Sequence, residues 1–220
     1  MTKGKQLLAL CALGVVASAA LVMPGFAQPK DDKKTEKKAE VAVGSDAPAF
    51  TLKDTDGKDV SLESLRKDGK IVIAFWFSPE CPFVKKHFEK GGNTFNDMYT
   101  KYKDKKVAIV AINSTAAGEQ GSGKDTNANA KKNWKIEFPI LLDESGDTGK
   151  AYGAKTTPHC FVIGTDGKLA YIGAIDDDAQ GKVGKTNYVT KAVDELLEGK
   201  KVSTTSTTPY GCGVKYARKK

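Results

Sequence analysis

The sequence has few of the residues that bind metal ions, and their spacing does not suit that purpose. It contains four cysteines and two histidines, with no Cys-x-x-Cys pair and no cysteine and histidine spaced as paired ligands. These absences argue against a structural zinc site. The consecutive acids Asp176, Asp177 and Asp178 lack the alternating spacing of a calcium-binding loop. We therefore expect no metal ion and no other cofactor.

Charged residues are absent from Leu7 to Val22, near the N-terminus. Two lysines precede this apolar run, and Pro24, Gly25 and Ala27 follow it. Small residues three positions and one position before Gln28 match the cleavage site of a secretory signal peptide, so we expect residues 1–27 to be removed. The alternative is an uncleaved membrane anchor, because the run is close to spanning length. Cleavage predicts a periplasmic or secreted protein.

Two further segments lack the residues of a folded core. Residues 28–43 carry charges of both signs and no aromatic residue, which predicts a charged, disordered linker. Residues 200–220 contain no acid and hold six of the eight net positive charges, so they read as a basic C-terminal tail. Because an exported protein rarely meets nucleic acid, we expect no nucleic-acid partner and interpret the tail as solvated or in loose contact with an anionic envelope surface. A single domain is expected between them, at residues 44–199.

In the first half of this domain, the sequence predicts a hairpin and a pair of parallel strands. Residues 49–62 alternate apolar and polar side chains around an Asp-Gly turn, as a hairpin does, and Ser61 can cap a short helix after it. Ile71–Phe77 and Val107–Ile112 are continuous apolar runs, the pattern of buried strands. A helix broken by two glycines fits residues 83–102 between them, which implies a right-handed crossover.

The second half predicts a β-hairpin followed by a helix. The segments are a polar loop at 115–128, a helix from Asn129 to Trp134, a strand at Phe138–Leu142, a short helix around 150–152, strands at His159–Ile163 and Leu169–Ile172, and a final helix at Tyr188–Leu197. The element order is that of the thioredoxin fold. We predict an α/β, thioredoxin-like fold with a central mixed sheet flanked by helices and an N-terminal hairpin extension.

Cys81 is the first candidate for chemistry, in the segment FWFSPECPFVKKH. It lies where a central strand gives way to a helix that Pro82 can begin. Backbone N–H groups and the helix dipole favour a thiolate there, Lys85 lies one turn further along the same face, and Glu80 acts in the opposite sense. The alternative is a buried packing cysteine. Exposure at the strand end favours the reactive interpretation.

Thr157 and Pro158, in the segment TTPHC, form the second candidate. In the thioredoxin fold, a proline at the start of the third sheet strand is cis and lies against the active cysteine. The backbone of the preceding residue, here Thr157, is then free to pair with an extended substrate. We predict a cis bond before Pro158.

These segments, with DESGDTGKAYGAKTTPHCFVIGTDGKLAYIGAIDD and the ending TPYGCGVKY, resemble the peroxiredoxin-like branch of the redoxin (AhpC/TSA) family over residues 44–217. The resemblance implies that Cys81 is the reactive thiol and Pro158 the cis-proline. It also relates Cys212 to a Gly-Cys-x-Ile/Val-Lys ending that is typical of relatives.

The sequence departs from the family pattern at four positions. Val84 stands where a thioredoxin has its second cysteine, which excludes a dithiol cycle within one helical turn. Ala74 and Ser78 replace the proline and threonine of the peroxiredoxin motif, although Ser78 can still hydrogen-bond a peroxide oxygen. Thr156 replaces a cysteine that many relatives carry. Thiol exchange therefore fits these residues better than peroxidase activity.

The hypothesis is an exported thiol oxidoreductase whose Cys81 thiolate attacks a disulfide or a peroxide. Cys212 or an external thiol reductant would then resolve the product. Cys160, in a predicted strand, is interpreted as a packing residue. The competing hypothesis is a non-enzymatic thioredoxin-fold module that binds partners or delivers copper through Cys81, His87 and His159.

Overall fold

The computed structural model describes residues 41–89 and 91–218. The predicted signal peptide and residues 28–40 of the predicted linker lie outside these residues. Within the described part of the chain, no helix has the length and apolar character needed to cross a membrane.

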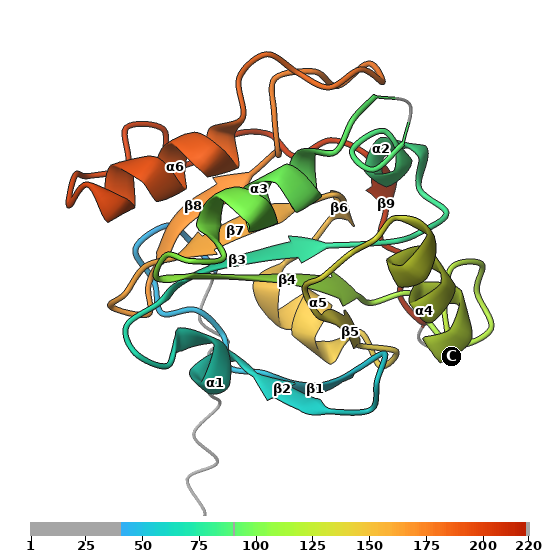
Figure 1. Cartoon of the computed structure of the whole chain (residues 1–220). Helices are drawn as coiled ribbons and strands as arrows, with labels where there is room; N and C mark the ends of the chain where they lie inside the picture. The colour runs from blue at the N-terminus through green and yellow to red at the C-terminus, as the bar shows by residue number, and fades with distance from the viewer. Residues whose placement is uncertain (1–40, 90, 219–220) are drawn as a thin grey trace, which may run out of the picture. The chain divides into compact units, whose positions relative to one another are not determined.

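A seven-stranded mixed sheet forms the centre of the domain (Figure 1). The strand order is β2-β1-β5-β4-β3-β7-β8. β3, β4 and β5 run parallel, and antiparallel hairpins flank them on both sides. The strands are β1 (Thr51–Asp54), β2 (Asp59–Ser61), β3 (Ile71–Trp76), β4 (Val107–Asn113), β5 (Ile140–Leu142), β7 (Cys160–Ile163) and β8 (Leu169–Gly173). This topology confirms the predicted thioredoxin-like fold with its N-terminal hairpin extension.

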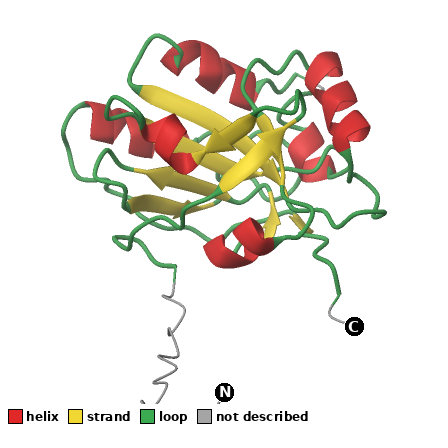
Figure 2. Cartoon of the chain, turned by 90° about the horizontal axis from the view of Figure 1, so that it is seen from below, coloured by secondary structure: helices red, strands yellow, loops and turns green. Residues whose placement is uncertain are grey.

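Helices cover both faces of the sheet (Figure 2). They are α1 (Leu62–Arg66), α2 (Pro82–Lys85), α3 (Thr94–Tyr102), α4 (Lys124–Asn133), α5 (Asp147–Tyr152) and α6 (Tyr188–Leu197). Side chains of successive strand residues point to opposite faces, so a strand buried on both faces must be apolar throughout. This explains the apolar run of β3: alternate residues pack with α3 and α6 on one face, and the others with α1 and α5 on the opposite face.

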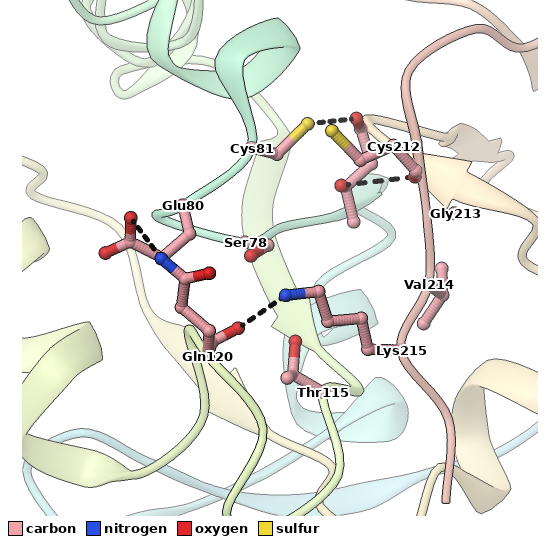
Figure 3. A pocket seen from close by; sticks show the side chains of 10 residues that line it. Ser78, Glu80, Cys81, Thr115, Gln120, Cys212, Gly213, Val214 and Lys215 are labelled. Carbon is pink, nitrogen blue, oxygen red and sulfur yellow. Dashed lines mark hydrogen bonds between the residues drawn. The ribbon is translucent and has the colours of Figure 1, made fainter. Parts of the chain in front are cut away.

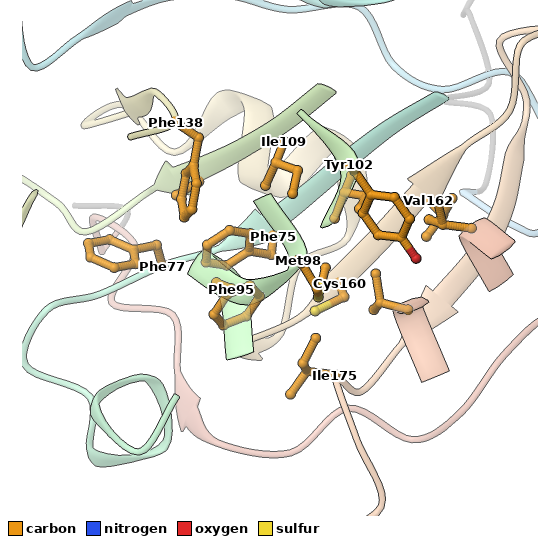
Figure 4. Packing of buried hydrophobic residues seen from close by; sticks show 14 of the residues in the cluster. Phe75, Phe77, Phe95, Met98, Tyr102, Ile109, Phe138, Cys160, Val162 and Ile175 are labelled. Carbon is orange, nitrogen blue, oxygen red and sulfur yellow. The ribbon is translucent and has the colours of Figure 1, made fainter. Parts of the chain in front are cut away.

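Aromatic rings fill the face that carries α3 and α6 (Figure 4). The ring of Phe75 in β3 stacks on that of Phe95 in α3, with centroids 3.8 Å apart. Phe138 meets Phe75 edge-on at 5.8 Å. Such ring pairs add to the stabilisation from burial alone. They fix α3 over β3 and so set the direction in which the chain leaves this strand.

Most predicted elements occur close to their expected positions. Ser61 caps α1 through a reciprocal pair of hydrogen bonds with Ser64. The helix predicted over 83–102 is broken around its two glycines into α2 and α3. One boundary prediction was wrong, because α4 begins at Lys124 and not at Asn129. The polar residues at its start do not form a loop: Asn127 is fully buried and donates to the carbonyl oxygen of Gly123 at 2.7 Å.

The chain after α6 lies against the domain and ends in a second, two-stranded sheet. β9 (Cys212–Gly213) pairs antiparallel with β6 (Thr156–Thr157), the strand just before Pro158. Val202 and Tyr210 pack against the core cluster that contains Phe75. The segment predicted as a loose basic tail is therefore held to the domain over residues 202–216.

Candidate active site

Cys81 occupies the position at the end of β3 that its sequence context predicts. It is the residue before α2, and its backbone N–H donates to the carbonyl oxygen of Ser78 at 3.1 Å. Its side chain is almost completely buried, and the thiol donates a hydrogen bond to the carbonyl oxygen of Thr157 at 2.9 Å. The prediction that this thiol is exposed was therefore wrong. The thiol nevertheless lines a pocket.

The bond between Thr157 and Pro158 is cis, as predicted. Thr157 lies in β6, and its register partner in β9 is Cys212. The Thr157 hydroxyl donates to the carbonyl oxygen of Cys212 at 3.5 Å. Cys212, which the sequence places on a solvated basic tail, thus lies beside Cys81, since both flank Thr157. Figure 3 shows the two side chains pointing toward one another.

Cys212 is the more accessible of these two thiols, and it is held in the protonated form. Burial raises its pKa to about 11, and the hydrogen bond and charge interaction with Cys81 act in the same direction. A hydrogen bond from the backbone of Phe83 and the charge of Lys215 partly oppose them. All three cysteines of the described residues are free, so the structure shows the reduced pair.

Cys160 differs from these two cysteines in its surroundings. It is completely buried in β7 among the residues that pack against α3 and α6, and burial raises the pKa of its thiol. Both observations agree with the interpretation of Cys160 as a packing residue. Cys81 and Cys212 are thus the two cysteines that share one site.

A pocket of about 100 Å³ opens beside the two sulfur atoms (Figure 3). It is lined by Ser78, Glu80, Cys81, Thr115, Gln120, Thr157, Cys212, Gly213, Val214 and Lys215. Four of the five residues proposed from the sequence line it, namely Cys81, Cys212, Thr157 and Ser78. Pro158 follows directly in the chain.

Two charged side chains, Glu80 and Lys215, line the pocket. Lys85, expected to support a thiolate, forms an ion pair with Glu80 at 3.3 Å instead. Lys215 donates to the carbonyl oxygen of Gln120 at 3.3 Å, and the Gln120 amide donates to Glu80 at 3.5 Å. Sequence reasoning missed Lys215 and Gln120, because nothing in their local sequence indicates that they meet 95 positions apart.

A buried polar network lies behind the site and includes residues that the sequence did not single out. The Tyr210 hydroxyl donates to Asp176, and the Lys86 ammonium lies 4.5 Å from the centre of the Tyr210 ring. Lys86 also donates to the carbonyl oxygens of Asp178 and Lys182 at 2.5 and 2.6 Å. We call Lys86, His87, Asp176 and Tyr210 the buried network. It joins α2, the loop after β8 and the segment that carries Cys212.

The histidines do not support a copper site. His87 hydrogen-bonds Thr94 at 3.0 Å and Tyr210 at 3.4 Å, and His159 accepts from the backbone of Lys155 at 3.3 Å. Burial lowers the pKa of each to about 4. Among residues 41–89 and 91–218, no three His, Cys, Asp or Glu side chains come together as metal ligands would.

Known proteins resemble much of this chain in sequence. Residues 43–172, more than half of the chain, match the model of the AhpC/TSA family. The chain is 33% identical over 135 residues to the thiol-disulfide oxidoreductase ResA of Bacillus subtilis (strain 168), a match covering 61% of this chain and 69% of that protein.

Two solved structures resemble nearly the whole described part of the chain. One is a hypothetical protein from Sinorhizobium meliloti 1021, with 30% identity, a TM-score of 0.73 and coverage of 82% of this chain and 97% of the other. The second is an uncharacterized conserved protein from Geobacillus kaustophilus, with 28% identity, a TM-score of 0.75 and coverage of 83% and 96%.

Proposed function

The chain belongs to the AhpC/TSA family, and from this premise we propose that it is a thiol-disulfide oxidoreductase that uses Cys81 and Cys212 as its redox pair. The observation that carries the proposal is the β6–β9 pairing, which holds Cys212 opposite Thr157, the residue whose carbonyl accepts from the Cys81 thiol. Val84 removes the usual second cysteine of the helix. Cys212 supplies a second thiol from a strand instead.

In the first step, the Cys81 thiolate attacks one sulfur of a substrate disulfide. A Cys81–substrate disulfide forms, the substrate S–S bond breaks, and the released thiolate takes up a proton. Thr157 accepts a hydrogen bond from the neutral Cys81 thiol, and Cys212 hydrogen-bonds the same sulfur. These two contacts orient the Cys81 sulfur toward the pocket. Their roles, with those of Pro158 and Ser78 in shaping the pocket, are part of the proposal.

In the second step, Cys212 attacks the Cys81 sulfur of the mixed disulfide. A Cys81–Cys212 disulfide forms and the second half of the substrate leaves as a thiol. Cys81 contributes to the raised pKa of Cys212 through a hydrogen bond and through its charge. Both contributions end once Cys81 is bound in a neutral disulfide, so Cys212 deprotonates more readily when it is needed. An external thiol reductant then regenerates the two thiols.

Peroxide reduction is the second candidate reaction of the same thiol, and the position of Ser78 favours it. Ser78 lines the pocket with Cys81, where its hydroxyl can donate to a peroxide oxygen. Attack would break the O–O bond, give a Cys81 sulfenic acid and release an alcohol, or water in the case of hydrogen peroxide. Condensation of the sulfenic acid with Cys212 would then give the same disulfide and one water molecule. Both reactions therefore end in one oxidised form.

The experiment is peptide mapping after oxidation with a small disulfide or with peroxide. We expect a Cys81–Cys212 disulfide within one chain, and we expect it to be lost in Cys81→Ser and Cys212→Ser but retained in Cys160→Ser, the matched control. A Cys212 that stays reduced while Cys81 pairs with Cys160 or is overoxidised would refute the mechanism. Comparing the rates for disulfide and peroxide separates the two candidate substrates.

Export is the remaining part of the proposal, and the features of residues 1–27 support it. The expected mature protein begins at or near Gln28 and works in the periplasm or outside the cell, where disulfides persist. The intact mass of protein recovered from its native host tests this. A mass that includes residues 1–27 would favour an anchored form.

A further inference from the structure

The edge of β6 is the place where a cysteine-bearing strand meets Cys81, and the chain itself occupies it. β9 pairs Cys212 with Thr157 and Gly213 with Thr156, which places the Cys212 side chain at Cys81. A strand of another polypeptide added to this edge would place its own cysteine at the same point. Both strands cannot occupy the edge together.

The segment that carries β9 is attached to the domain before Cys212. Thr207 donates its backbone N–H to the carbonyl oxygen of Ile172 at 3.1 Å, and its side chain accepts from the backbone of Ala174 at 2.9 Å. Tyr210 then enters the buried network through Asp176. Release of β9 in this direction would break backbone hydrogen bonds and expose the partly buried ring of Tyr210.

The same segment is attached to the domain after Cys212. Val214 donates to the carbonyl oxygen of Lys155 at 3.1 Å, and the Lys215 carbonyl accepts from Ala116 at 2.8 Å. The Tyr216 hydroxyl donates to the carbonyl oxygen of Ala154 at 2.9 Å. Cys212 is therefore in the middle of a segment that hydrogen bonds attach to the domain on both sides.

The pocket is the route to Cys81 that remains. It has a volume of about 100 Å³ and is walled on one side by Gly213, Val214 and Lys215 of the same segment. A disulfide carried by a small molecule can bring one sulfur through such an opening. An extended polypeptide around a disulfide needs the edge that β9 fills.

Resting on the proposed function, we propose that the substrates of Cys81 are low-molecular-weight disulfides, and that β9 excludes disulfides within extended polypeptides. The C-terminal segment then supplies the resolving thiol and also sets the substrate class.

Two probes with the same reactive group test this proposal. The small probe is N-acetylcysteine methylamide joined by a disulfide to 2-mercaptoethanol, and the large probe is a twelve-residue peptide with the same mixed disulfide on a central cysteine. The measured quantity is the rate at which free Cys81 is lost, followed by mass spectrometry in a Cys212→Ser background. We expect the peptide to react at least about 100-fold more slowly, because it must first displace several ladder and side-chain hydrogen bonds.

Gly211 and Thr208, in the segment that carries β9, provide a matched pair of variants. Gly211 has φ +129°, and a Cβ there would collide with the carbonyl oxygen of Thr157, so Gly211→Ala forces β9 and Thr157 apart. Thr208 lies outside the pocket lining and its side chain is exposed, so Thr208→Ala leaves β9 in place. We expect Gly211→Ala to raise the peptide-to-small rate ratio at least about tenfold and Thr208→Ala to leave it unchanged.

The outcomes separate this inference from the proposed function. Equal rates for the two probes on the Cys212→Ser protein would overturn the inference while supporting exchange at Cys81. An unchanged ratio in Gly211→Ala, with hydrogen exchange showing the Val214 amide released, would also overturn it. Failure of the small probe to react with Cys81 would overturn the proposed function and this inference together. If Gly211→Ala does not fold, Tyr216→Ala, which removes the anchor on Ala154, takes its place with the same expected direction.

Discussion

Replacing Cys81 by alanine tests whether the two thiols control each other. Cys212 has a pKa of about 11, compared with 9.0 for an ordinary cysteine. At neutral pH this difference makes its thiolate about 100-fold rarer than that of an ordinary cysteine. Burial is the largest cause, followed by the hydrogen bond with Cys81 and then by its charge. Cys81→Ala removes the last two causes, so we expect the Cys212 thiolate fraction to rise by about 3- to 30-fold.

Alkylation by iodoacetamide measures this change. The rate at Cys212 is followed by mass spectrometry between pH 6.5 and 9 in the reduced wild type and in Cys81→Ala. Below the pKa of Cys212 the rate is proportional to its thiolate fraction, so the ratio of the two rates measures the change in that fraction. Cys160 is an internal control, because it is completely buried and reacts only if the domain opens. A Cys212 rate that is unchanged or lower in Cys81→Ala, with Cys160 still protected, would refute the proposed coupling and with it the timing of the second step.

Three further predictions concern stability, each measured by urea unfolding. His87 and His159 have pKa values near 4 in the fold, mainly because of burial, whereas their pKa in the unfolded chain is about 6.5. Because the unfolded chain binds these protons more tightly, the free energy of unfolding is highest above pH 6.5 and falls by about 2 kcal/mol per histidine by pH 5. His159→Asn, which keeps a hydrogen-bond acceptor, should remove about half of this pH dependence. A free energy of unfolding that depends on pH as steeply as in the wild type would contradict this prediction. Tyr210→Phe removes a donor from the buried network and should cost about 1–3 kcal/mol, so a neutral effect would mean that the network is not needed. Ser114→Ala leaves the indole N–H of Trp76 buried without its 2.9 Å partner and should cost a similar amount, which Ser114→Thr should partly avoid.

The sequence predicts the fold well because its strongest signals are local or periodic. The run Ile71–Phe77 must be buried on both faces, and the structure buries it so. The Asp-Gly turn sets the hairpin, and Ser61 starts α1 through its own side chain. The loop predicted over 115–128 is confirmed for 115–123 and wrong for 124–128, because composition does not distinguish a polar loop from a polar helix start. Asn127 satisfies its buried amide with backbone carbonyls that only the folded loop provides.

The sequence names candidate residues that the structure brings together at the pocket, but it does not give their arrangement. It places Cys212 on a solvated tail, because two residues of strand give no periodic signal. The pairing of Cys212 with Thr157 joins positions 55 residues apart and depends on the fold between them. Lys85 illustrates the opposite error: its spacing along the helix suggests a partner for the thiolate, whereas its ammonium group forms an ion pair with Glu80 at 3.3 Å.

The pairing of β6 with β9 also links the oxidation state of the protein to its folding free energy. A Cys81–Cys212 bond would close a loop of 131 residues, since 212 − 81 = 131. By the chain-entropy relation, closing such a loop destabilises the unfolded chain by about 5 kcal/mol. Because folding and disulfide formation make up one thermodynamic cycle, formation of this disulfide is more favourable in the folded chain than in the unfolded chain by the same free energy. The reduction potential of the pair is thus set in part by the position at which the C-terminal segment holds Cys212, and loosening that segment would make the disulfide easier to reduce.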